Sequence, residues 1–183
     1  MKSLHNKKII ISAGASGIGL ATAKVCLSRG AYVYLCDIND KSLKKLNKHP
    51  LKNKRLFVYQ CDASNEEQVS LFFNKVKKKT KKIDALINNV GIAGPTGSLE
   101  KLKSKDWEKT LHVDVNSHFY FTKKAIPLIK KSKNGSIINI STFGVFEPDS
   151  NFPTSGAFRS SLAAFTKIYS DKYAADNIRM NNI

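Results

Sequence analysis

The chain has 183 residues, 42% of them hydrophobic and 25% charged, which is enough for one domain with a buried core. Its apolar stretches are far shorter than the roughly 18 residues of a membrane-spanning helix, so no membrane segment is expected. The formal net charge of +17 comes mostly from scattered lysines, without the arginine forks and interleaved aromatic residues of nucleic-acid readers, so nucleic acid is not an expected partner.

Three cysteines, Cys26, Cys36 and Cys61, give an odd number with no framework spacing. This pattern favours a reducing compartment, and we expect a cytoplasmic protein. Each cysteine lies on an apolar stretch, which is typical of a small buried side chain rather than of a metal ligand or a nucleophile. No metal site is expected.

Short β-rich runs alternate with longer helical stretches, as in a parallel sheet with crossover helices. The expected strands are 8–12, 31–36, 56–60, 85–88 and 136–140, with a sixth beginning near Ile178. The expected helices are 18–29, 40–48, 66–79, 105–131 and 154–175. The strands are nearly continuous apolar runs, as expected where helices cover both faces of a sheet. The sequence therefore predicts a doubly wound α/β fold of three layers, formed as a single domain by residues 1–183.

Two of these helices begin next to candidate capping residues. Ser64 or Asn65 stands before the acidic start of the third helix, and Ser104 stands before Asp106 at the start of the fourth. Side-chain oxygens and negative charge at these positions stabilise a helix N-terminus.

A glycine-rich segment, Ser12-Ala13-Gly14-Ala15-Ser16-Gly17-Ile18-Gly19, joins the first strand to the first helix. Such a turn brings backbone N–H groups close to an anionic diphosphate at the helix N-terminus, where a Cβ would obstruct the approach. Asp37 ends the second strand, where its carboxylate can accept hydrogen bonds from both hydroxyls of an adenosine ribose and would repel a 2′-phosphate. Strand, turn, helix and acid together predict a dinucleotide site that prefers NAD over NADP; the alternative is a purely structural turn.

These residues resemble the short-chain dehydrogenase/reductase family, whose pattern is Thr-Gly-x-x-x-Gly-x-Gly, with Ser12 and Ala13 in place of its first two residues. Further similarities are Cys61-Asp62 after the third strand, Asn88-Asn89-Val90-Gly91 after the fourth, and the tail 177–183. The resemblance implies a Rossmann fold. It implies cofactor contacts at Ser12, Gly14, Ser16, Gly17, Ile18, Gly19, Asp37, Asp62, Ala63, Asn89, Gly91 and Arg159. For Asp62 and Asn88, turn and capping hydrogen bonds are an equal alternative, and Ala13 tests whether its position needs a positive φ.

The resemblance also implies hydride transfer between a nicotinamide and a carbinol or carbonyl carbon. Ser141 matches the serine that orients the reacting oxygen in this family, and Asn116 matches the helix asparagine that supports its proton relay. At the positions of the Tyr-x-x-x-Lys pair stand Ser155 and Arg159, because the segment 161–167 keeps the register of the family.

The presence of Ser155 and Arg159 at these two positions indicates an altered active site. An aliphatic hydroxyl is much harder to ionise than that of a tyrosine, and an arginine stays protonated. Arg159 could still donate to the nicotinamide ribose, and Ser141 and Ser155 could both hydrogen-bond a substrate oxygen. Glu147 or Asp149 is a candidate replacement for the proton donor.

A second match to the Tyr-x-x-x-Lys spacing begins at Tyr120, but it precedes Ser141 and lies in a long helix. We therefore expect Tyr120 to pack rather than to react. The chains of the family continue beyond the segment that Ile183 ends, so the fold is expected to be incomplete at its C-terminus, with an unpaired sheet edge.

Two functions follow as hypotheses. One is an NAD-dependent oxidoreductase with an altered active site, acting on a small-molecule alcohol or ketone. The alternative is a catalytically inactive dinucleotide-binding or interaction protein. In either case the resemblance implies a homo-oligomer formed through the helices around 105–131 and 154–175.

Overall fold

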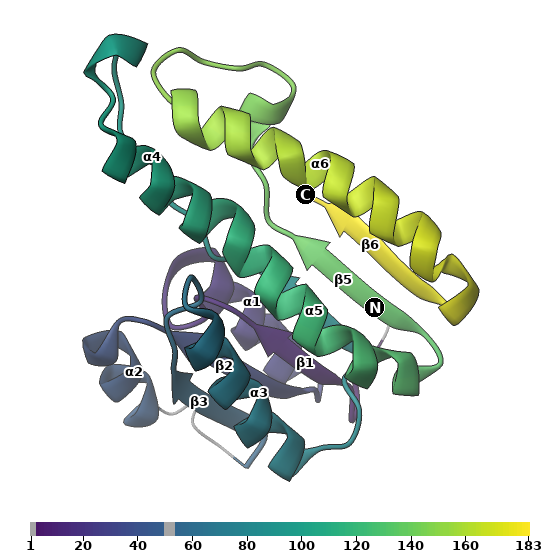
Figure 1. The fold of residues 1–183 in the computed structure, drawn as a ribbon. Helices are drawn as coiled ribbons and strands as arrows, with labels where there is room; N and C mark the ends of the chain where they lie inside the picture. The colour runs from purple at the N-terminus through teal and green to yellow at the C-terminus, as the bar shows by residue number, and fades with distance from the viewer. Residues whose placement is uncertain (1–2, 50–53) are drawn as a thin grey trace.

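The computed structural model describes residues 3–49 and 54–183, in which six strands form one parallel sheet (Figure 1). The strands are β1 (Lys8–Ile11), β2 (Tyr32–Asp37), β3 (Leu56–Gln60), β4 (Ala85–Asn88), β5 (Gly135–Asn139) and β6 (Ile178–Asn182). Their order across the sheet is β3-β2-β1-β4-β5-β6. The order therefore reverses between β1 and β4, and in open parallel sheets such a reversal leaves a crevice at the carboxyl ends of the two strands.

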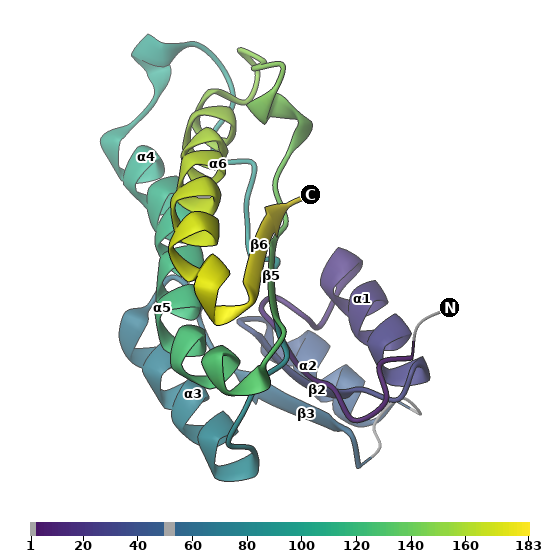
Figure 2. The same ribbon diagram turned by 90° about the vertical axis from the view of Figure 1, so that its right-hand side faces the viewer.

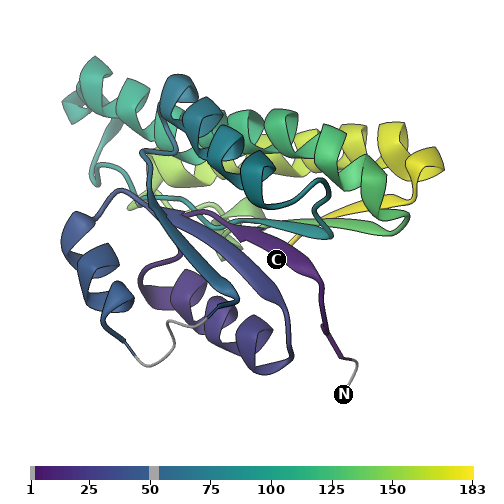
Figure 3. The same cartoon turned by 90° about the horizontal axis from the view of Figure 1, so that it is seen from below.

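Helices pack on the sheet as the sequence predicts. The α-helices are α1 (Gly17–Ser28), α2 (Asp40–Asn47), α3 (Glu66–Lys79), α4 (Ser104–Leu111), α5 (Ser117–Ile129) and α6 (Pro153–Tyr173). Short 3₁₀ turns are Leu99–Lys101, Lys130–Ser132, Phe143–Val145 and Ala174–Asp176, and a π-helical segment spans His112–Asn116. Figure 3 shows α1 and α2 below the sheet and the other α-helices above it, which gives the predicted doubly wound α/β fold.

Two clusters of buried side chains fill the space between these layers. Successive strand residues point to opposite faces, so Ile10 joins the cluster under α3 and α5, whereas Ile9 and Ile11 join the cluster under α1 and α2. All three cysteines are free and buried, as predicted. Tyr120 packs against the first cluster, which confirms its expected role.

The coverage of β6 differs from the sequence prediction that helices cover both faces of the sheet. Buried and exposed residues alternate along β6, with Ile178 and Met180 inside and Arg179 and Asn181 outside. Among the described helices, α6 covers the buried face of this strand (Figure 2). None of the described helices is both long enough and apolar enough to cross a membrane.

The predicted helix 105–131 is helical throughout but not uniformly α-helical. The chain passes from α4 through the π-helical segment His112–Asn116 into α5 and then into a 3₁₀ turn. A π-helical turn contains an extra residue, which changes the direction of the side chains that follow it, and such turns are frequent at functional sites.

The capping predictions were right for one helix and wrong for another. Asn65, rather than Ser64, caps α3, because its side chain accepts a hydrogen bond from the amide of Gln68. Ser104 does not cap α4. It is the first helical residue, and Lys103 stands at the cap position without a side-chain hydrogen bond.

The turn after β1 places Ala13 at a φ of +48°, in the left-handed region. Most residues with a Cβ avoid this region, which glycine adopts freely. The position occupied by Ala13 therefore does require a positive φ.

Replacing Ala13 with glycine should relieve this strain. We expect Ala13→Gly to raise the free energy of unfolding by about 1 kcal/mol, measured by urea denaturation. The matched control is Ala15→Gly in the same turn, which has no positive φ and should lower stability. An Ala13→Gly variant no more stable than the parent would contradict the assigned backbone conformation.

Candidate functional site

The glycine-rich turn is closely packed where its glycines lie. A Cβ at Gly14 would stand 2.7 Å from the Cβ of Leu35 on β2, and one at Gly19 would overlap the carbonyl oxygen of Ala13. These two positions let α1 approach the strands. By contrast, Ser16, Gly17 and Ile18 are exposed. Ser16 stands at the cap position of α1 without a side-chain hydrogen bond, so no capping side chain covers the first amides of this helix. An exposed helix N-terminus of this kind suits an anionic group.

Asp37 is held against this turn. Its Oδ2 accepts a hydrogen bond from the amide of Ala15 at 3.0 Å, and its Oδ1 accepts one from the amide of Asn39 at 2.9 Å. A carboxylate oxygen has capacity for a second hydrogen bond, so the same carboxylate can receive ribose hydroxyls. Asp37 therefore supports the glycine-rich turn through its carboxylate.

Ser12 and Asn89 join the turn to the loop after β4. The Ser12 hydroxyl accepts a hydrogen bond from the amide of Asn89 at 3.0 Å, and the Asn89 side chain donates to the carbonyls of Ser12 and Ala13 at 3.2 and 3.0 Å. Ser12 is almost fully buried. Its hydroxyl therefore joins the two loops from within the protein, while Asn89 also lines the neighbouring cavity.

Asp62, Ala63 and Asn88 make contacts inside the protein. One oxygen of Asp62 accepts hydrogen bonds from both the amide and the hydroxyl of Ser64, which is a local turn. Ala63 is buried. The Asn88 side chain donates to Thr122 and Asn139 in the core. The described contacts of Asp62 and Asn88 thus correspond to the structural alternative, although a further bond from a ligand to Asp62 is not blocked by them.

A cavity of about 550 Å³ lies at the carboxyl ends of β4 and β5, beside the turn. Its lining includes Ile18, Asn89, Gly91, Ser141, Glu147, Asp149, Ser155 and Arg159. The Ser141 hydroxyl oxygen is buried and has no hydrogen-bond partner among the described residues. The structure therefore gathers both predicted serines, Arg159 and both candidate acids around one space.

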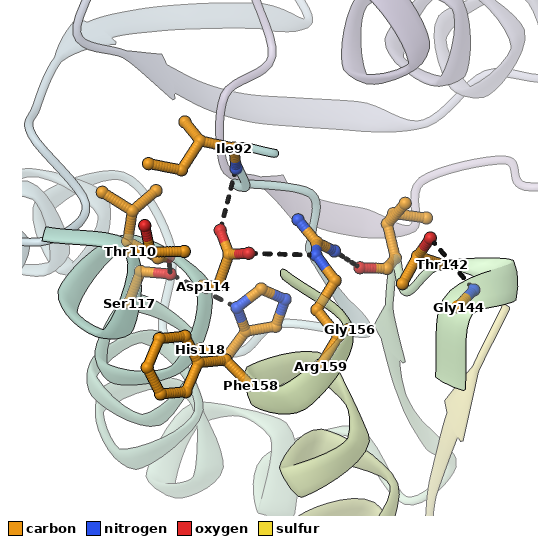
Figure 4. Close-up of polar contacts among 12 residues, drawn as sticks. Ile92, Thr110, Asp114, Ser117, His118, Thr142, Gly144, Gly156, Phe158 and Arg159 are labelled. Carbon is orange, nitrogen blue, oxygen red and sulfur yellow. Dashed lines mark hydrogen bonds and ion pairs between the residues drawn. The ribbon is translucent and has the colours of Figure 1, made fainter. Parts of the chain in front are cut away.

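Arg159 on α6 lines this cavity, and its guanidinium points toward Asp114 (Figure 4). Its Nε forms an ion pair with Oδ2 of Asp114 at 3.2 Å, and its Nη1 donates to the carbonyl oxygen of Ile140 at 2.6 Å. Its Nη2 lies against Gly91, where a Cβ would overlap it. Gly91 thus makes room for the guanidinium.

The π-helical segment supplies the partner of Arg159. Asp114 is fully buried, and its Oδ1 accepts a hydrogen bond from the amide of Ile92 at 2.8 Å. Burial raises the pKa of Asp114, although Arg159, the Ile92 amide and Ser155 oppose the rise. Asn116, the residue named by the family resemblance, instead pairs with His112 at 2.8 Å and is not among the described lining residues.

A buried histidine lies beside this ion pair. His118 on α5 is fully buried, and its Nδ1 is 3.3 Å from the Ser117 hydroxyl (Figure 4). Burial, followed by the positive charge of Arg159, lowers the pKa of His118 to about 3. The imidazole is therefore neutral at physiological pH.

The sequence analysis did not identify Asp114 or His118 as site residues. The sequence does contain a signal for Asp114, because this acid stands between two apolar residues, Val113 and Val115, in the expected helix 105–131. A buried carboxylate requires a cationic or hydrogen-bonding partner. That requirement could have linked Asp114 to a buried arginine, but not to Arg159 in particular.

Comparison with known proteins identifies similar dehydrogenases and reductases. The family model described as short chain dehydrogenase matches residues 7–183. A 3-oxoacyl-[acyl-carrier-protein] reductase FabG from Thermotoga maritima is 30% identical over 182 residues, which are 98% of this chain and 73% of that protein. A 3beta-hydroxysteroid dehydrogenase from Mediterraneibacter gnavus is 29% identical over 188 residues, covering 100% of this chain and 66% of that protein.

A solved structure shares the fold. The crystal structure of a short chain dehydrogenase from Salmonella enterica serovar Typhi superposes with a TM-score of 0.91, covering 98% of this chain and 75% of that one. The sequence identity is 21%, so this similarity concerns the fold alone.

The buried neutral histidine makes stability depend on pH. A folded-state pKa of about 3, against 6.5 for an unperturbed histidine, favours the folded state above pH 6.5, and this contribution is lost as pH falls toward 3. Between pH 7.5 and 5, His118 should account for about 2 kcal/mol of lost stability.

The variant His118→Asn should remove this part of the pH dependence in denaturant titrations. The control His112→Asn changes an exposed histidine and should retain the parent slope. Equal slopes for the parent and His118→Asn would rule out a buried neutral imidazole as its source.

Proposed function

Because the chain belongs to the short-chain dehydrogenase family of oxidoreductases, we propose that it binds NAD and transfers a hydride between this cofactor and a small-molecule alcohol or ketone, with an altered active site. The observation that supports this most directly is the cavity beside the glycine-rich turn, with Ser141, Ser155 and Arg159 in its lining. The family uses nicotinamide cofactors, and the residues present fit one.

The dinucleotide would lie across the reversal of strand order. Its diphosphate would fit the exposed start of α1 at Ser16, Gly17 and Ile18, while the buried Gly14 and Gly19 let this helix pack close to the strands. Asp37 would accept the adenosine ribose hydroxyls, and its charge disfavours the 2′-phosphate of NADP. Asp62 and Ala63 would border the adenine end, and Asn89, Gly91 and Arg159 would border the nicotinamide ribose.

Ser141 is the best placed group for a substrate oxygen, because its buried hydroxyl has no partner in the described part of the chain. A buried polar group without a partner costs free energy, and a substrate carbonyl or hydroxyl would satisfy it. Ser155 lines the same cavity and can add a second hydrogen bond. The cofactor, when bound, supplies the hydride or accepts it.

Proton transfer is where this site differs from its family. Arg159 remains protonated, so it can donate hydrogen bonds but cannot act as a base. Glu147 and Asp149 are exposed and line the cavity. We propose that one of them exchanges the proton of the substrate oxygen, directly or through water.

A catalytically inactive dinucleotide-binding or interaction protein is the second candidate. The buried ion pair between Arg159 and Asp114 favours it, because it fixes a non-titrating group where the resemblance places a lysine that tunes a tyrosine. For either candidate we propose a cytoplasmic homo-oligomer. Exposed apolar side chains on α5 and α6, such as Phe119 and Ile168, support an assembly through these helices.

Cofactor binding by the purified chain tests the first part of this proposal. In calorimetric titrations we expect NAD to bind at least about tenfold more tightly than NADP, because Asp37 repels the 2′-phosphate. Asp37→Asn removes the charge and should reduce this preference, whereas Glu108→Gln, an exposed acid on α4, should leave it unchanged. Tighter binding of NADP by the parent chain would refute the assignment.

Restoring the family pair separates the two candidates. The double variant Ser155→Tyr with Arg159→Lys should gain hydride transfer, measured as NADH absorbance over a panel of alcohols and ketones, if the parent is an intact but silent scaffold. Ser155 lines the cavity of about 550 Å³, so the larger side chain would enter this space. If the parent chain already converts a substrate, and the double variant has lost this activity, the altered enzyme is favoured instead.

A further inference from the structure

The charge around the cavity is unlike that of the whole chain. The chain carries 31 Lys and Arg against 14 Asp and Glu. Yet among the described residues that line the cavity, Arg159 is the single cation, and Glu147 and Asp149 are both acidic. The cavity therefore does not share the positive surface of the protein.

The one cation in this lining is already compensated. Side-chain exposure is 9% for Arg159 and 0% for Asp114, so their 3.2 Å ion pair lies away from solvent. The Ile92 amide donates a hydrogen bond to the other carboxylate oxygen of Asp114. The Ile140 carbonyl accepts one from Nη1 of Arg159. These two backbone groups thus fix the orientation of the pair (Figure 4).

We propose that Asp114 masks the charge of Arg159, so that the cavity accepts neutral hydroxyl and carbonyl compounds and excludes carboxylates and phosphates. Asp114 is in this sense a positioning and specificity-determining residue. The inference rests on the proposed function for the identity of the cavity as a substrate site, and it deepens that function by naming the class of substrate.

The physical reason lies in the low dielectric of the site. An unpaired guanidinium presents a fork of N–H donors that binds carboxylates strongly, often through two hydrogen bonds. Next to Arg159, however, an incoming anion would meet the repulsion of Asp114 along with the attraction of the guanidinium. Nη2, which lies against Gly91, keeps its donors and can still bond a neutral oxygen.

Two probes of nearly equal shape test the proposal. Mandelate and 1-phenylethane-1,2-diol share a phenyl ring and a secondary alcohol but differ in bearing a carboxylate or a neutral hydroxymethyl group. Binding is measured by calorimetry in low-salt buffer, because salt screens the charges that are compared. This readout needs no turnover, and NAD titration of the same samples reports separately on the proposed function.

We expect the parent chain to bind mandelate no more tightly than the diol. Asp114→Asn keeps the shape and can still accept the Ile92 hydrogen bond, but it unmasks Arg159. Mandelate affinity should then rise at least about tenfold while diol affinity changes little. A purely structural role for Asp114 would produce no such gain. The double variant Asp114→Asn with Arg159→Gln should return mandelate binding to the parent level.

Three results would overturn the proposal. The first is a parent chain that prefers mandelate to the diol. The second is a folded Asp114→Asn variant, verified by circular dichroism, that gains no mandelate affinity. Should the single variant not fold, the double variant decides, because it buries no uncompensated charge. Mandelate binding in the double variant that is markedly weaker than in the parent would show that Arg159 is not masked.

Discussion

Arg159, which lines the cavity, forms a buried ion pair with Asp114, and the elements around them are shaped by the need to bury two opposite charges. Removing one partner of such a pair leaves an uncompensated charge, which costs several kcal/mol. Three features of the neighbouring residues follow from the need to bury this pair. Gly91 lacks the Cβ that would overlap the guanidinium, the π-helical turn directs Asp114 inward, and His118 stays neutral beside the cation.

The same pair connects the two halves of the site. On one side of Arg159 lie Gly91 and Asn89, which belong to the loop that holds the glycine-rich turn. Ser155, on α6, lines the same cavity as these residues. The turn agrees with the pattern of the family in most positions, while the residues under the cavity do not. The proposed dinucleotide site, with Ser155 and Arg159 nearby in place of the family's Tyr and Lys, is therefore consistent with both an altered enzyme and a silent binder.

Much of the fold could be predicted because strand and helix patterns are local. The apolar runs of β1 to β5, the cap at Asn65 and the acidic first turn that begins at Glu66 depend on neighbours in sequence. The positive φ of Ala13 was raised as a question by the glycine pattern, and only the backbone answers it. The π-helical turn could not be predicted, since nothing in the residues of His112–Asn116 distinguishes a π-helical turn from an α-helix. Neither could the ion pair, because the contact of Asp114 with Arg159 depends on how α6 packs against the π-helical segment.

The most direct test of this account is a crystal structure of the chain with NAD bound. We expect the diphosphate at the start of α1, the adenosine ribose hydroxyls on Asp37, and the nicotinamide in the cavity between Gly91 and Ser141, with the ion pair of Arg159 and Asp114 intact. A dinucleotide bound away from the glycine-rich turn, or a nicotinamide outside this cavity, would contradict it.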